Sequence, residues 1–173
     1  MSRIVVCGCS GSGKTTFALR LGRRLGLPVV HLDVLFWRPG WTQPDRTGFR
    51  QRVSEAIDGE RWICDGNYSV WIGDLTLPRA DRIIMLERSR WLCLARVIRR
   101  SLFQDGRADL AEGCQEHFDW QLIRYIWNYP KLGGPRMEAA CMVYGDDVPL
   151  LRLRGGRAIA AYLSSVDASA DRI

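Results

Sequence analysis

Lysine and histidine are scarce in this chain, and several kinds of sequence feature are missing altogether. Only Lys14 and Lys131 are lysines among the 25 lysine and arginine residues, and only His31 and His117 are histidines. No apolar stretch is long enough to span a bilayer, and there is no internal repeat or low-complexity tract. The N-terminus leads directly into a strand-like run, with no signal peptide. We therefore expect a cytoplasmic protein with no membrane partner.

The scarcity of histidine also limits what the six cysteines can do. They are Cys7, Cys9, Cys64, Cys93, Cys114 and Cys141. Cys7 and Cys9 have no second pair at the spacing of zinc ligands, and most of the cysteines lie in apolar or helical surroundings. We expect reduced thiols and no zinc site. Because Cys9 lies inside a glycine-rich loop, we hypothesise that its oxidation inhibits the protein.

The composition is that of one globular domain with a basic net charge. Apolar residues make up 47% of the chain and charged residues 25%, and the net charge is +6. A length of 173 residues is enough for one domain with a substantial core. The charge fits nucleic-acid binding as well as binding of nucleotides or phosphorylated metabolites, so it leaves both open.

The most specific motif is residues 8–15, Gly-Cys-Ser-Gly-Ser-Gly-Lys-Thr, which fits the P-loop pattern G-x-x-x-x-G-K-[ST]. In such a loop, backbone N–H groups and a helix N-terminus hold a phosphate chain. Lys14 reaches the β- and γ-phosphates, and the Thr15 hydroxyl lies on Mg²⁺. The sequence thus predicts a nucleoside triphosphate, ATP, bound by Gly8, Ser10, Gly11, Ser12, Gly13, Lys14, Thr15 and Thr16. The alternative is a glycine-rich turn that matches by chance.

Strand-like and helical patterns alternate along the whole chain. Strands are predicted at residues 3–8, 28–32, 62–64, 82–86 and 148–153, and helices at 14–25, 45–58, 89–103, 116–128, 137–144 and 157–166. Residues 104–113 are interpreted as a mobile surface segment, and the tail from Asp167 as frayed. This order predicts an α/β fold with a five-stranded parallel sheet. Ligands of such sheets bind beyond the carboxyl ends of the strands.

Two carboxylates follow predicted strands and are expected at this edge of the sheet. Asp65 ends the third strand, where it either holds Mg²⁺, directly or through water, or starts an Asp-Gly turn. Asp33 follows the second strand and either accepts a proton from an attacking hydroxyl, holds a substrate hydroxyl, or caps the next element. Trp37 and Trp41 follow in a Pro/Gly loop, where they form a stacking wall for a substrate or cover the core.

Arginines gather where the third predicted helix, residues 89–103, ends. Arg96, Arg99 and Arg100 lie in this helix, and Arg107 lies in the segment that follows. They are interpreted as a lid that closes over phosphates, with Arg96 and Arg100 as catalytic candidates and Arg99 and Arg107 as substrate contacts. A solvated helix face or a nucleic-acid patch has the same pattern.

Together these residues resemble the nucleoside-monophosphate-kinase-like branch of P-loop proteins, and within it the adenylate-kinase-related bacterial proteins labelled DNA topology modulation or FlaR-like. The resemblance rests on residues 8–16, 31–33, 37–41 and 62–68, and residues 80–82, 96–100 and 127–130 extend it. It implies a three-layer P-loop NTPase fold with a five-stranded parallel sheet and a short lid.

The same resemblance bears on the phosphoryl acceptor. Adenylate kinases have Asp-Gly-Phe-Pro-Arg after the third strand, and their arginine holds the monophosphate. Here Asn67, Tyr68 and Ser69 replace the last three residues. The acceptor is therefore expected to be another nucleotide or a small hydroxylated molecule, as in shikimate- or gluconate-kinase-like relatives.

The sequence predicts a Mg²⁺-dependent phosphotransferase that moves the γ-phosphate of ATP to a small acceptor. Thr15 and Asp65 place Mg²⁺, and Asp33 orients or deprotonates the acceptor, with Asn67 and Tyr68 nearby. No covalent intermediate is expected, since positioning and charge stabilisation suffice.

The expected single domain, residues 1–173, has a core at about 1–36, 60–103 and 136–166. An acceptor-side insert occupies about 37–59, and a lid region about 104–135. The alternative function is a nucleotide-binding regulatory ATPase that acts on DNA or a protein partner. No helix-turn-helix, zinc finger or basic–aromatic repeat supports contact with nucleic acid.

Overall fold

A parallel sheet is the centre of the protein in the computed structural model, which describes residues 2–103, 110–114 and 118–170. The strands β1 (Arg3–Gly8), β2 (Val29–His31), β3 (Trp62–Asp65), β4 (Arg82–Glu87) and β5 (Leu150–Arg154) lie in the order β2-β3-β1-β4-β5. Every pairing between neighbours is parallel. This confirms the predicted α/β fold with a five-stranded parallel sheet.

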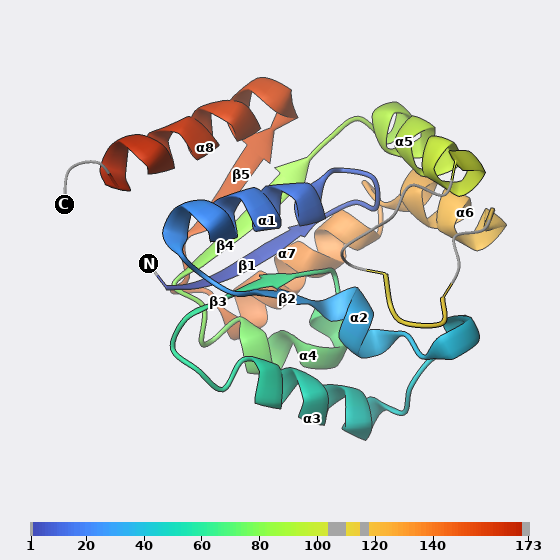
Figure 1. Ribbon diagram of the computed structural model, residues 1–173, viewed down its shortest axis with the longest axis horizontal. Helices are drawn as coiled ribbons and strands as arrows, with labels where there is room; N and C mark the ends of the chain where they lie inside the picture. The colour runs from blue at the N-terminus through green and yellow to red at the C-terminus, as the bar shows by residue number, and fades with distance from the viewer. Residues whose placement is uncertain (1, 104–109, 115–117, 171–173) are drawn as a thin grey trace.

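Helices cover both faces of the sheet, so the fold has three layers (Figure 1). One face carries α1 (Lys14–Leu25) and α8 (Gly155–Ala170). The other carries α2 (Leu32–Phe36), α3 (Arg46–Ala56), α4 (Ser69–Thr76) and α7 (Gly133–Tyr144). The helices α5 (Arg90–Phe103) and α6 (Trp120–Asn128) lie beyond the end of β1, and a 3₁₀ turn spans Pro39–Trp41.

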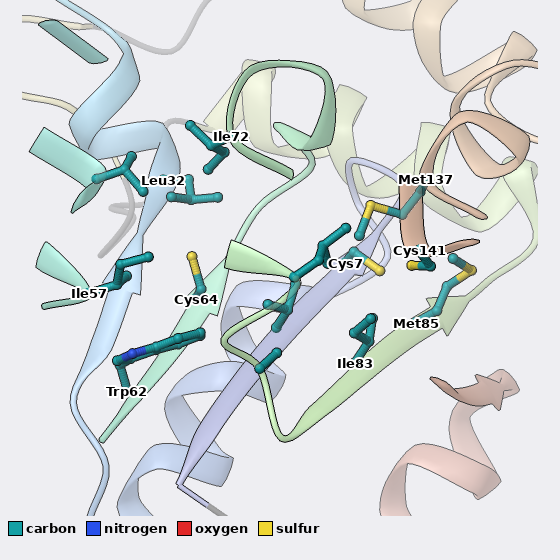
Figure 2. Packing of buried hydrophobic residues seen from close by; sticks show 14 of the residues in the cluster. Cys7, Leu32, Ile57, Trp62, Cys64, Ile72, Ile83, Met85, Met137 and Cys141 are labelled. Atoms are coloured by element: carbon teal, nitrogen blue, oxygen red, sulfur yellow. The ribbon is translucent and has the colours of Figure 1, made fainter. Parts of the chain in front are cut away.

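The two faces follow from strand alternation, because successive side chains of a strand point to opposite sides of the sheet. Ile4 and Val6 of β1 pack beneath α1 and α8, whereas Val5 and Cys7 pack beneath the other layer. On that second side, Figure 2 shows that Cys7, Met85, Met137 and Cys141 pack together between β1, β4 and α7. Both faces of the sheet are therefore buried, as the continuous apolar runs of its strands require.

Several element boundaries differ from the prediction. Residue 32 belongs to α2 rather than to the second strand, and α4 was not predicted, because its Val-Trp-Ile run lacks a clear helical period. The last helix continues to Ala170, beyond the predicted start of the tail at Asp167, and Leu163 and Val166 pack on the sheet. Residues 171–173 of the predicted tail lie outside the described residues. Helix α6 begins at Trp120 rather than at residue 116, and α7 begins at Gly133 rather than at Met137.

Part of the predicted mobile segment, residues 104–109 with Arg107, lies outside the described residues, as do residues 115–117. No helix in the described part of the chain is both long and apolar enough to cross a membrane.

Asp81 fastens the start of β1 to the loop before β4. Its carboxylate accepts hydrogen bonds from the backbone N–H groups of Ser2 (2.7 Å) and Arg3 (3.0 Å) and pairs with the Arg3 guanidinium at 2.9 Å. These bonds, that of Ser2 first, lower the pKa of Asp81 to about 2. The ionised carboxylate is thus the form that stabilises the native state.

We expect Asp81→Asn to lower the melting temperature at neutral pH. The native-state pKa of Asp81 is depressed, so its contribution is complete above about pH 4 and is lost as the pH falls through about 2. Thermal melts of both proteins between these pH values should therefore converge toward the acid end. The exposed control Asp146→Asn should melt like the wild type at every pH, and a constant gap for Asp81→Asn would contradict the assignment.

Candidate functional site

The carboxyl ends of β1, β2 and β3 bring the predicted site regions together. Val6 of β1 pairs with Asp65 of β3, and His31 of β2 pairs with the same Asp65. The glycine loop leaves β1 two residues after Val6, and Asp33 follows two residues after His31. All these segments lie along one edge of the sheet because parallel strands end on the same side (Figure 1).

The glycine loop has a backbone that residues with side chains rarely adopt. Gly11 has a φ of 79° and Gly13 a φ of 90°, both in the left-handed region that favours glycine. The N–H of Ser12 donates to the Cys9 carbonyl at 3.0 Å and closes the turn. Gly13 is the N-cap of α1 and offers no side-chain acceptor, and the first turn of α1 contains no acidic residue. The helix N-terminus thus keeps its donors for an anion.

The side chains of the loop differ in exposure. Lys14 and Thr15 are partly exposed at the start of α1, and Thr16 is exposed. Ser12 is only 1% exposed, and its hydroxyl oxygen is buried without a hydrogen-bond partner among the described residues. Lys14 and Thr15 are therefore placed where a phosphate chain on the loop can meet them.

Asp65 is a buried carboxylate beside the loop. It is 3% exposed, and its Oδ2 lies 3.2 Å from the Nδ1 of His31, close enough for the ring N–H to donate. Its Oδ1 is buried and has no hydrogen-bond partner among the residues that the structure describes. A desolvated carboxylate oxygen is unfavourable unless a cation or donor meets it. The residues present here fit Mg²⁺, which Asp65, directly or through water, and Thr15 could hold.

His31 was not among the predicted site residues. The available signal was its position, since it ends one strand as Asp65 ends the neighbouring strand. Predicting their contact required the register between β2 and β3, which the sequence does not contain.

Asn67 ties the loop after β3 to the start of the glycine loop. Its side-chain oxygen accepts from the Gly8 N–H at 3.0 Å, and its side-chain N–H group donates to the Gly8 carbonyl. The same nitrogen lies 3.4 Å from the Tyr125 hydroxyl of α6. Both ends of the amide therefore bind the backbone of the loop, in a region where the sequence predicted a substrate contact.

Tyr68 and Asp33 form a second polar pair at this edge. The Tyr68 hydroxyl donates to Oδ1 of Asp33 at 2.6 Å. Burial, followed by the charge and hydrogen bond of Asp33, raises the pKa of Tyr68, so the hydroxyl remains a donor. The Tyr68 ring packs on Phe36 and Phe49 with centroids 4.6 and 5.3 Å away. The partly exposed Asp33 carboxylate is thus held from one side by a rigid aromatic donor.

Trp37 and Trp41 lie side by side after α2. Their ring centroids are 5.3 Å apart at an interplanar angle of 73°. Trp37 also meets the buried ring of Phe36 edge-on at 5.0 Å and packs against the core. Trp41 has a φ of 59°, which is unusual for a residue with a side chain. Trp37 therefore packs against the core, while both rings stay partly exposed.

The structure describes three of the four predicted lid arginines, all on α5. Arg96 donates to the carbonyl oxygens of Gly11 at 3.2 Å and Ser12 at 3.4 Å, so it supports the glycine loop from α5. Arg99 is exposed and Arg100 partly exposed on the same helix, while Arg107 lies outside the described residues.

Known proteins show a likeness to this chain in structure only. Neither a protein-family model nor a curated protein matches the sequence. Among solved structures, a gluconokinase from Sinorhizobium meliloti 1021 matches with a TM-score of 0.58 and 17% sequence identity. The match covers 99% of this chain and 92% of the gluconokinase chain. The protein therefore shares the overall fold of this gluconokinase.

Proposed function

We propose that the protein is a Mg²⁺-dependent phosphotransferase that moves the γ-phosphate of ATP to a small acceptor. The acceptor class is a nucleotide, a nucleoside or a small hydroxylated metabolite. The observation that carries the proposal is the buried Asp65 carboxylate, whose Oδ1 has no partner among the described residues, next to a glycine loop with open helix donors. The fold shared with a solved gluconokinase supports it.

The loop residues would bind the triphosphate. The N–H groups of the loop and the N-terminus of α1 would face the phosphates. Lys14 would add a mobile positive charge for the β- and γ-phosphates. Thr15 and Asp65 would hold Mg²⁺, which neutralises phosphate charge when bound. Arg96 binds the carbonyls of Gly11 and Ser12 and would keep them turned away from the phosphates.

Asp33 and Tyr68 would act on the acceptor. The Tyr68 hydroxyl occupies Oδ1 of Asp33 and fixes the carboxylate. A carboxylate oriented in this way can accept a hydrogen bond, or the proton, of an attacking hydroxyl. Trp37 and Trp41 would supply an apolar wall next to it, as sugar-like and planar molecules prefer.

Further parts of the proposal come from the sequence. Arg99, Arg100 and Arg107 are kept as lid residues, Asn67 as a neighbour of the acceptor, and the division into core, insert and lid as predicted. The resemblance to FlaR-like proteins and the cytoplasmic location belong to the same proposal.

The direct test is ADP release from Mg-ATP by the purified protein. The assay is run alone and then with separate pools of nucleoside monophosphates, nucleosides and sugar acids, and with duplex DNA. Stimulation by one small-molecule pool is the expected result, and dividing that pool identifies the acceptor. No stimulation by any small molecule, together with turnover raised by DNA, would overturn the proposal.

Asp33→Asn is expected to lower kcat/KM for the acceptor by about 10²–10⁴-fold, because the amide cannot accept the acceptor's proton. Tyr68→Phe removes only the hydroxyl that fixes Asp33, so the expected loss is about tenfold. Initial rates at varied acceptor concentration measure both effects, with KM for ATP as the internal control. Equal losses in the two variants would contradict these different roles.

The helices α5 and α6 favour a second candidate, a nucleotide-binding ATPase that contacts nucleic acid. They contain Arg90, Arg96, Arg99, Arg100 and Arg124 and no acidic residue. Trp91 is 66% exposed and Trp127 43% exposed on the same pair of helices. Arginines beside exposed aromatic rings suit nucleic acid, and DNA binding that weakens steeply with salt would favour this candidate.

A further inference from the structure

Two cysteines that the proposed reaction does not use meet behind the glycine loop. Cys9 is the second residue of the loop, and Cys93 lies near the start of α5, 84 positions later in the sequence. Both belong to one buried cluster with Leu94, Val97 and Ile126, and each thiol shifts the pKa of the other. Both are free thiols.

The backbone of the glycine loop packs tightly against the backbone of α5 beside this pair. A Cβ added at Gly11 would lie 2.4 Å from the carbonyl oxygen of Cys93 and 3.0 Å from its Cα. One turn further along α5, Arg96 binds the carbonyls of Gly11 and Ser12. A change in the distance between α5 and Cys9 must therefore alter the loop that holds the phosphates.

The two thiols differ in how readily they ionise. Their mutual hydrogen bond lowers the pKa of Cys93 and raises that of Cys9. The positive charges of Arg96, Arg88 and Lys14 lower the pKa of Cys93 further, against the effect of burial. The thiolate, which is the reactive form, is thus favoured at Cys93.

We propose that Cys9 and Cys93 form a reversible disulfide on reaction with a peroxide, and that this disulfide prevents nucleotide binding at the loop. The second half rests on the proposed function. The Cys93 thiolate attacks one peroxide oxygen; the O–O bond breaks, an S–O bond forms, and the released hydroxide takes up a proton. The Cys9 sulfur then attacks Cys93, the S–O bond breaks, and hydroxide leaves with the Cys9 proton as water. Two thiols lose two electrons, and the peroxide gains them.

Formation of the disulfide shortens the contact between α5 and the loop. Because the space between Gly11 and Cys93 is already filled, the loop must shift, and its N–H groups lose their common direction. Cys9 is 5% exposed and Cys93 0%, so peroxide reaches them only when α5 and the loop separate. Bound Mg-ATP, which holds the loop closed, should slow the oxidation.

The test oxidises the full chain with hydrogen peroxide and measures disulfide pairing by peptide mass spectrometry and ATP affinity by titration. The expected result is a Cys9–Cys93 disulfide, an ATP affinity lower by about tenfold or more, and full recovery with a reducing agent. Cys93→Ser should bind ATP like the reduced wild type and keep that affinity in peroxide. The matched control Cys141→Ser, which removes a buried thiol of another cluster, should lose affinity as the wild type does.

The outcomes separate the two proposals. A disulfide between other cysteines, or equal loss of affinity in Cys93→Ser, would overturn the inference. Failure of the reduced wild type to bind ATP would instead overturn the proposed function, while the mass-spectrometric pairing would still decide whether Cys9 and Cys93 react.

Discussion

Lys14→Ala is expected to lower the rate of phosphoryl transfer by about 10²–10³-fold, as loss of one charged group at a transition state does. Lys14 is the only lysine of the glycine loop and is placed at the first residue of α1. Its charge would meet the β- and γ-phosphates in the proposed complex. The loop contains no arginine that could replace it. Single-turnover measurement of ADP formation at saturating Mg-ATP reports this effect directly.

The fold should survive this substitution. Lys14 is partly exposed, and alanine has the highest helix propensity, so the melting temperature should stay within a few degrees of the wild type. The sequence offers a matched control, since Lys131 is its only other lysine and is exposed outside the loop. Lys131→Ala should turn over like the wild type, and full activity of Lys14→Ala would end the phosphotransferase proposal.

Asp65→Asn should separate activity from stability. The carboxylate is 3% exposed, contacts His31 and leaves Oδ1 without a partner among the described residues, which costs the native state free energy. An amide of the same shape is neutral and still accepts from His31. We therefore expect an equal or higher melting temperature together with a loss of turnover of about 10²–10³-fold, because the amide binds Mg²⁺ poorly.

The measurement is a melting curve paired with a titration of activity by Mg²⁺. Asp65→Asn should need far more Mg²⁺ for half-maximal rate, whereas Asp74→Asn should not. Asp74 is a suitable control because it is an exposed carboxylate whose partner is Arg50, 2.7 Å away on α3. A sharp fall in the melting temperature of Asp65→Asn with unchanged Mg²⁺ demand would assign Asp65 a structural role only.

Much of the fold was predictable because local patterns specify it. Continuous apolar runs such as residues 82–86 belong to strands covered on both faces, and this pattern needs no long-range information. The short helices were harder. Residues 69–76 form α4 because Ile72 is buried against the core, a tertiary effect that overrides the weak helical pattern of the segment.

For the candidate site, the sequence by itself determined the residues whose backbone is set locally. The glycine loop is one of these, because Gly11 and Gly13 adopt left-handed conformations that few other residues allow. The spacing of these glycines before Lys14 therefore predicts the loop from one short segment of sequence.

Only the tertiary structure decided which distant residues meet that loop. His31 beside Asp65, Asn67 on Gly8, Arg96 on Gly11 and Cys93 on Cys9 are contacts between segments far apart in the sequence. Strand register and helix packing create them, and both depend on the summed burial of many apolar side chains. No single segment contains that sum, so the sequence showed the loop and the structure showed what surrounds it.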